Sequence, residues 1–152
     1  MDTVSCAFSE RLSDLLQLEG KTAYGLKKDT GLPLASIHKW LRGKYYPDLN
    51  AFFILADYFK ISVDELLGLK ETYGEKTEKK SPTKENAQKT LIAHLQNYLQ
   101  TEKITKHKLA TRLQVGQGTL TRWFAENAVP DTAVLIRISI LLETPLDDLL
   151  GR

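Results

Sequence analysis

One pattern of residues occurs twice in this chain, at a constant offset of 83 positions. The pattern comprises a threonine, a tryptophan, a Pro-Asp pair and a closing Leu-Leu-Gly. It is found at Thr22, Trp40, Pro47, Asp48 and 66–68, and again at Thr105, Trp123, Pro130, Asp131 and 149–151. A repeat at fixed spacing decides the architecture before any local pattern does. Because residues 8–69 align on residues 91–152 without a gap, and such a segment is as long as a small domain, we predict two domains in tandem.

The spacing of apolar residues predicts helices in each copy. One helix face is marked in both copies by leucines and a phenylalanine four positions apart, at Phe8, Leu12 and Leu16 and at Leu91, Leu95 and Leu99. The same signals predict four further helices in the first copy: after an N-cap at Thr22, from Pro33 as first residue to about Leu41, over 52–59 and over 63–67. Trp40 and Trp123 follow an inward aliphatic residue by three positions and are predicted to lie in the core. The predicted fold class is therefore all-α.

A polar segment rich in lysine and glutamate separates the two copies. Its composition is typical of a linker, and we predict domain 1 over 1–69, a charged linker over 70–85 and domain 2 over 86–152. A helix is expected to restart near Pro82 to Lys84. If the linker is flexible, its ~15 residues would span on the order of 20–25 Å root-mean-square.

The net charge of +2 is unevenly distributed along the chain. Residues 21–46 carry a net charge of +5, whereas the rest of the first copy, 1–20 and 47–69, carries −6. In the second copy, residues 103–129 carry +4. Each copy thus has a basic middle third, which suits a polyanionic partner.

Several classes of protein are disfavoured by the composition. The single cysteine, Cys6, cannot form a disulfide within the chain, no run approaches the ~18 apolar residues of a membrane helix, and the N-terminus lacks a signal-peptide pattern. We therefore predict a cytoplasmic protein with no membrane partner. His94 and His107 lack partners at metal-ligand spacing, so surface positions are expected for both. Because no phosphate-binding glycine loop, catalytic carboxylate pair or Ser-His-Asp order is present, we predict no enzymatic activity, no cofactor and no small-molecule ligand.

Seven features of the first copy occur in an order that resembles a known family. They are Gly31, Ile37, Trp40, Gly43, Lys44, Pro47 and the closing Asp64-Glu-Leu-Leu-Gly68. This order is similar to that of helix-turn-helix proteins of the Cro/lambda-repressor type, the XRE family, and residues 91–151 resemble it with weaker matches. The resemblance implies two five-helix domains, each with a third helix that enters the DNA major groove. It also implies double-stranded DNA as the partner and transcriptional regulation, usually repression, in a bacterium or its phage.

The resemblance implies a stripe of base-contacting side chains on each third helix. The stripe comprises Leu34, Ala35, Ser36, His38 and Lys39 in the first copy and Gln117, Thr119, Thr121 and Arg122 in the second. Gln117 occupies the place where the family often carries a base-contacting glutamine, which can pair with adenine. Leu34 departs from that pattern, so a thymine methyl is an alternative target for Leu34 or Ala35. Phosphate contacts are expected from Thr22, Arg42, Lys44, Tyr45, Thr105, Lys106 and Asn127.

Three further departures from the family pattern favour unequal roles for the two copies. Lys27 stands where the family prefers an alanine, Gln114 replaces the turn glycine, and Glu126 replaces Gly43. Because the two stripes differ, we predict that one chain binds two unlike half-sites in a non-palindromic sequence.

Two alternatives stay open at this stage. In one, a single copy binds DNA and the other makes a dimer interface, which leaves a homodimer open. In the other, the chain is a protein-binding module on the same fold, such as an antitoxin or a phage-encoded inhibitor of a host protein.

Overall fold

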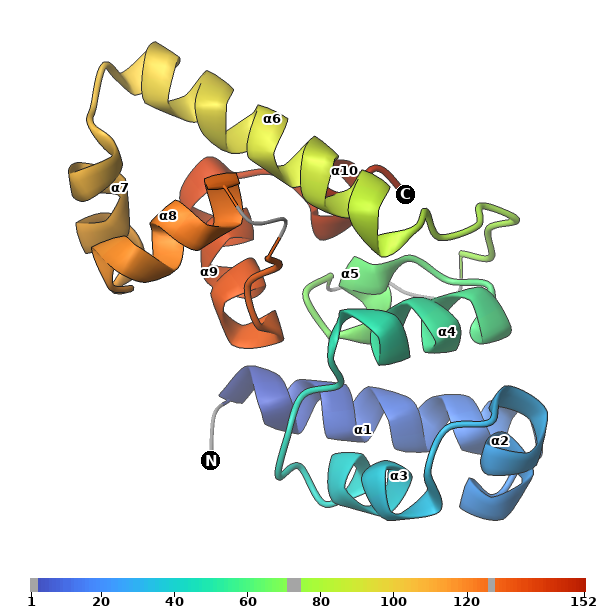
Figure 1. Ribbon diagram of the computed structural model, residues 1–152. Helices are drawn as coiled ribbons and strands as arrows, with labels where there is room; N and C mark the ends of the chain where they lie inside the picture. The colour runs from blue at the N-terminus through green and yellow to red at the C-terminus, as the bar shows by residue number, and fades with distance from the viewer. Residues whose placement is uncertain (1–2, 71–74, 126–127) are drawn as a thin grey trace. The chain divides into compact units, whose positions relative to one another are not determined.

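The computed structural model describes residues 3–70, 75–125 and 128–152, with side chains described from Ala7 onward. Its described residues form helices and no strand, so the predicted all-α class is confirmed (Figure 1). The chain divides into two compact units, residues 1–80 and residues 81–152. Of the predicted site, Asn127 lies outside the described residues. No helix in the described ranges is long and apolar enough to cross a membrane.

The described residues of each unit contain five helices, and the helices of the two units follow the same order from longest to shortest. The first unit holds α1 (Thr3–Leu18), α2 (Ala23–Thr30), α3 (Leu34–Leu41), α4 (Leu49–Phe59) and α5 (Val63–Leu66). The second unit holds α6 (Lys84–Glu102), α7 (Lys106–Leu113), α8 (Gln117–Ala125), α9 (Thr132–Leu142) and α10 (Leu146–Leu150). The restart of a helix expected near Pro82 to Lys84 is confirmed by α6.

Short helices such as α2 and α7 are marginal by themselves, so their ends need capping. Thr22 accepts a hydrogen bond from the backbone N–H of Gly25 at 3.0 Å, and Thr105 accepts one from Lys108 at 3.2 Å. An N-cap of this kind is worth ~1 kcal/mol. The predicted N-cap at Thr22 is therefore confirmed. Pro33 was expected to be the first residue of α3. It is instead the N-cap, one position before the first helical residue.

Left-handed backbone conformations recur at the 83-residue offset. The residue that ends α2 is Gly31, with φ of 77°, and the residue that ends α7 is Gln114, with φ of 58°. The closing glycines of the two units, Gly68 and Gly151, have φ values of 76° and 75°. A Cβ atom at Gly68 would approach the Ala7 side chain to 2.8 Å, and one at Gly151 would approach Thr90 Oγ1 to 2.9 Å. Glycine at these two places lets the last helix of each unit lie against the first.

The core of each unit is built from the apolar faces that the sequence indicates. Trp40 and Trp123 are 5% and 3% exposed, so their predicted core positions are confirmed. The ring of Phe8 packs edge-on against Trp40, with ring centroids 6.4 Å apart. Aliphatic and aromatic side chains with no exposed surface fill the remaining space, among them Leu12, Leu26, Ile37, Phe52, Leu55, Leu91, Leu95, Leu109, Leu120, Leu135 and Leu149.

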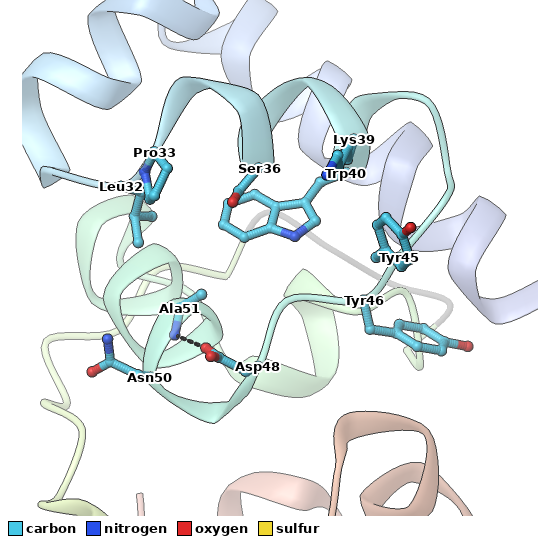
Figure 2. A pocket seen from close by; sticks show the side chains of 10 residues that line it. All are labelled: Leu32, Pro33, Ser36, Lys39, Trp40, Tyr45, Tyr46, Asp48, Asn50 and Ala51. Carbon is cyan, nitrogen blue, oxygen red and sulfur yellow. Dashed lines mark hydrogen bonds between the residues drawn. The ribbon is translucent and has the colours of Figure 1, made fainter.

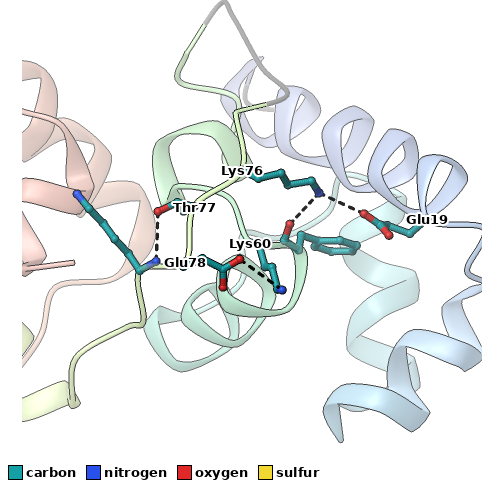
Figure 3. A network of polar contacts seen from close by, with 7 residues as sticks. Glu19, Lys60, Lys76, Thr77 and Glu78 are labelled. Carbon is teal, nitrogen blue, oxygen red and sulfur yellow. Dashed lines mark hydrogen bonds and ion pairs between the residues drawn. The ribbon is translucent and has the colours of Figure 1, made fainter.

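The polar segment that follows α5 makes several contacts with the first unit (Figure 3). Lys76 Nζ donates hydrogen bonds to Glu19 Oε1 at 3.2 Å and to the Phe59 carbonyl at 3.0 Å. The N–H of Thr77 donates to the Lys60 carbonyl at 2.8 Å, and Lys60 Nζ lies 3.5 Å from Glu78 Oε1.

At its other end the segment is bonded to the second unit. Ser81 Oγ accepts a hydrogen bond from Arg152 Nε at 3.0 Å, and Arg152 is also paired with Asp147 at 2.9 Å. Only Lys79 and Lys80 separate Glu78, which is bonded to the first unit, from Ser81.

Candidate nucleic-acid interface

In the first unit, α3 packs against α1 and α2 and turns one face outward. Its inner face holds Ile37 and Trp40, both buried. The Ser9 hydroxyl donates to the Leu41 carbonyl at 2.5 Å and thereby ties the last turn of α3 to α1. On the outward face Ala35, His38 and Lys39 are exposed, whereas Leu34 and Ser36 are half-buried. The helix is therefore held by its apolar side, and the predicted stripe lies on the side that a partner can reach.

Asp29 is the acid among the cations of residues 21–46, and its carboxylate is bonded to neighbouring side chains. The Tyr58 hydroxyl donates to Asp29 Oδ2 at 2.6 Å, and Lys21 Nζ lies 3.3 Å from the same oxygen. The bond from Tyr58 first, and then the contact with Lys21, lower the pKa of Asp29 below its usual value of 3.8. The same bond to Asp29 raises the pKa of Tyr58 to about 12. Asp29 thus offsets the charge of Lys21, with which it forms an ion pair, and a smaller part of that of Lys28.

The other cations of residues 21–46 keep their charges available. They are Lys27, Lys28, Lys39, Arg42 and Lys44, all exposed or half-buried. Within the described part of the chain, none of the five forms an ion pair with an acid. A surface of this kind attracts phosphate groups. When phosphates bind to it, the counterions that were condensed on them are released.

A hollow of about 410 Å³ lies beside α3 in the first unit (Figure 2). Its floor is the Trp40 indole, and its wall on α3 includes Ser36 and Lys39. Tyr45, which is 57% exposed, lies at the edge with its ring 5.6 Å from Lys39 Nζ. A cation held over an aromatic ring at this distance is a cation–π contact worth ~0.5–1 kcal/mol at an exposed site.

The start of α4 closes the hollow on the other side. Asp48 accepts a hydrogen bond from the Ala51 N–H at 2.9 Å, and Asn50 lies in the same turn (Figure 2). The Asp48 carboxylate is therefore directed at the helix end, where it is stabilised by the N-terminal N–H groups. Asn50 and Tyr46 line the hollow but were not among the predicted residues. Tyr46 could be placed from the sequence only in the loop, with packing and phosphate contact both open, and no sequence signal identifies Asn50, because only the path of residues 42–48 brings it beside Lys39.

In the second unit, α8 packs against α6 and α7. Leu120 and Trp123 are buried on its inner side, and Gln88 Nε2 donates to the Trp123 carbonyl at 2.6 Å, which anchors the helix to α6. Of the predicted stripe, Gln117, Thr121 and Arg122 are exposed and Thr119 is half-buried. The Thr121 hydroxyl donates to the Gln117 carbonyl at 2.9 Å, so its oxygen is left to accept a bond from a ligand.

Two of the three predicted phosphate-contacting residues of the second unit, Thr105 and Lys106, lie at the start of α7. Thr105 uses an oxygen lone pair as N-cap, which leaves its hydroxyl proton for an acceptor. Lys106 Nζ lies 4.4 Å from the centroid of the Phe124 ring. This cation–π contact holds the ammonium group at the junction of α7 and α8.

One contact at this junction involves a residue outside the predicted site. His107 Nδ1 lies 3.2 Å from Gln117 Oε1, and both side chains are exposed. The sequence gives no sign of this pair, because the two residues are ten positions apart on different helices.

The second unit therefore contains α7, a tight left-handed turn at Gln114 and α8 with polar side chains outward beside exposed cations, which defines a helix-turn-helix. Residues 95–149 match the family model described as helix-turn-helix. The matched segment includes all of α7, α8 and α9. The match supports an XRE-type helix-turn-helix of the DNA-binding regulatory class over these residues. No curated protein and no solved structure is detectably similar to the chain.

Proposed function

We propose that this protein is a sequence-specific double-stranded DNA-binding repressor that uses both units as separate helix-turn-helix domains. The observation that carries the proposal is the exposed polar face of α8, held in place by buried Leu120 and Trp123. A helix anchored by its inner face has the shape that the DNA major groove admits. The proposed base contacts of the second unit are Gln117, Thr119, Thr121 and Arg122.

The first unit supports the same role on its own residues. Its α3 is anchored by Ile37 and Trp40 in the same way, and exposed cations surround it. The proposed contacts on α3 are Leu34, Ala35, Ser36, His38 and Lys39. Thr22, Arg42, Lys44 and Tyr45 would bind phosphates, and the hollow beside Lys39 gives a phosphate oxygen a cation and the Ser36 hydroxyl together.

The two units would contact different bases. Gln and Arg side chains can form paired hydrogen bonds with adenine and guanine, whereas Leu34 and Ala35 can only make apolar contacts. One chain that binds through both units would thus occupy two unlike half-sites. Linking the units makes the second binding event intramolecular and raises the overall affinity without new contacts.

The contacts of residues 76–81 bear on the distance between the two half-sites. A free linker of ~15 residues would accept many half-site spacings. Because Lys76, Thr77 and Glu78 are bonded to the first unit and Ser81 to the second, the free tether is shorter than that, and we propose that it limits how far apart the two half-sites can be. We propose that the two domains span residues 1–69 and 86–152 and that residues 70–85 link them.

The proposal is tested by selecting duplexes from a random pool with the intact chain and sequencing them. The expected result is one non-palindromic sequence with two half-sites, whose affinity falls steeply with salt because phosphate contacts release counterions. The matched control is Lys89→Ala, which removes an exposed cation of α6 that pairs with Glu85. No enrichment, or an affinity that does not change with salt, would contradict DNA binding.

A second candidate function is protein binding by the first unit, and one surface favours it. A hollow of about 540 Å³ is lined by the apolar residues Leu15, Leu18 and Ile61 together with charged residues such as Asp14 and Glu19, and Leu18 is 82% exposed. An exposed apolar side chain beside such a hollow suits the apolar anchor of a protein partner. In this case Leu18→Ser would abolish partner binding and leave DNA binding unchanged.

A further inference from the structure

We propose that His107 positions the carboxamide of Gln117 and thereby sets the base preference of the second unit. This inference rests on the proposed DNA-binding function. His107 does not contact a base itself, and its effect on the DNA passes through Gln117.

The geometry places the two side chains on one accessible surface. His107 lies in the first turn of α7, and Gln117 is the first residue of α8. His107 Nδ1 is 3.2 Å from Gln117 Oε1, which is within hydrogen-bond distance. His107 is therefore a side-chain hydrogen-bond partner of the Gln117 carboxamide.

The chemistry of the carboxamide explains why this contact matters. A glutamine binds adenine through its oxygen, which accepts from N6, and its nitrogen, which donates to N7. A carboxamide that rotates by half a turn exchanges the two groups and loses both bonds. Its oxygen has two lone pairs, so Nδ1–H of His107 can occupy one while the other remains for adenine. The bond from His107 thus holds the carboxamide in the orientation that adenine requires.

The first unit provides an internal comparison at the equivalent positions. Tyr24 and Leu34 stand 83 residues before His107 and Gln117. Leucine has no group that can accept or donate a hydrogen bond. The arrangement therefore belongs to the second unit alone, and its loss is expected to change one half-site and not the other.

The experiment measures base preference in the intact chain. The base pair contacted by Gln117 is first located as the position whose preference is lost in Gln117→Ala. The ratio of Kd values for guanine and adenine at this position is then measured for His107→Ala and for His107→Gln, whose amide can still donate to Gln117. We expect His107→Ala to lower the ratio about fivefold, as loss of one hydrogen bond does, and His107→Gln to retain it.

A double substitution separates positioning from other roles of His107. In a Gln117→Ala background, His107→Ala is expected to leave the ratio unchanged. If His107→Ala weakens all duplexes equally, or if its effect on the ratio persists without Gln117, the inference is overturned while DNA binding stands. If the wild-type chain enriches no duplex, the proposed function fails, and the inference fails with it.

Discussion

Asp29 and Arg112 occupy equivalent positions in the last turn of α2 and of α7, yet they carry opposite charges and each is bonded to a tyrosine. Asp29 accepts a hydrogen bond from Tyr58 of α4 at 2.6 Å, whereas Arg112 donates one to Tyr98 of α6 at 2.8 Å. This tyrosine bond therefore joins the second helix to the fourth helix in one unit and to the first helix in the other. A single repeated fold is stabilised by different polar contacts in its two copies.

Replacing Tyr58 with phenylalanine should raise the pKa of Asp29 toward its usual 3.8, because the bond from Tyr58 is the largest cause of the lowering. A carboxyl whose pKa is lowered by folding stabilises the fold above its unfolded pKa, and this stability is lost as the pH falls. As the pH falls below about 4, where an ordinary aspartate takes up its proton, the free energy of unfolding of the first unit should therefore decrease less in the Tyr58→Phe variant than in the wild type. Titration of the Asp29 carboxyl by NMR checks the shift. Tyr98→Phe is the matched control and should leave the Asp29 titration unchanged.

Replacing Gln114 with glycine should stabilise the second unit. Gln114 has φ of 58°, and a left-handed conformation costs a residue with a side chain roughly 1–2 kcal/mol relative to glycine. The opposite kind of change, Gly31→Ala, should destabilise the first unit by ~1 kcal/mol, because Gly31 has φ of 77°, where alanine is strained, and a Cβ atom there would meet no atom within 4 Å. Denaturant unfolding measures both free energies. If both substitutions stabilised their unit, or if both destabilised it, this account of the turn would be contradicted.

Lys39→Ala and Arg122→Ala should each weaken DNA binding if both units contact the duplex. A base contact by either side chain is worth roughly 1–3 kcal/mol, so each loss should be of that size and specific to one half-site. Kd values on single-half-site and double-half-site duplexes measure it. A loss for Arg122→Ala alone would instead indicate that the first unit serves another purpose, such as a dimer interface or protein binding.

Replacing Lys60 and Lys76 with alanine should widen the range of half-site spacings that the chain accepts. Both ammonium groups hold the segment 76–78 on the first unit, through Glu78 and Glu19 respectively. Exposed ion pairs contribute only ~0–1 kcal/mol, so stability should change little while the segment is held only by the bond from the Thr77 N–H to the Lys60 carbonyl. Kd values over duplexes with increasing half-site spacing measure the range. Lys80→Ala is the control, and an unchanged range in the double variant would show that these contacts do not limit spacing.

Much of the secondary structure could be predicted from local sequence. The start of α2 after Thr22 follows from the hydrogen bond of an N-cap, and its end before Gly31 follows from the steric freedom of glycine. The burial of Trp40 and Trp123 follows from helical periodicity. Pro33 was misplaced by one position because an N-cap and a first helical residue have similar requirements, and its N–H is not needed at either.

The candidate site could be predicted only as two stripes of outward side chains. His107, Tyr46 and Asn50 were not predicted, because their proximity to Gln117 or Lys39 depends on how separate helices and loops pack.

The sequence by itself determined the repeat, the helices, the inward faces and the basic middle of each copy, because these depend on residues a few positions apart. The tertiary structure alone decided that Asp29 is bonded to Tyr58, that Lys76 is bonded to Glu19 and that His107 contacts Gln117. These partners are 29, 57 and 10 residues apart in the chain, respectively. Polar contacts between separate elements depend on the directions in which packed helices present their side chains, and periodicity along one helix does not specify those directions.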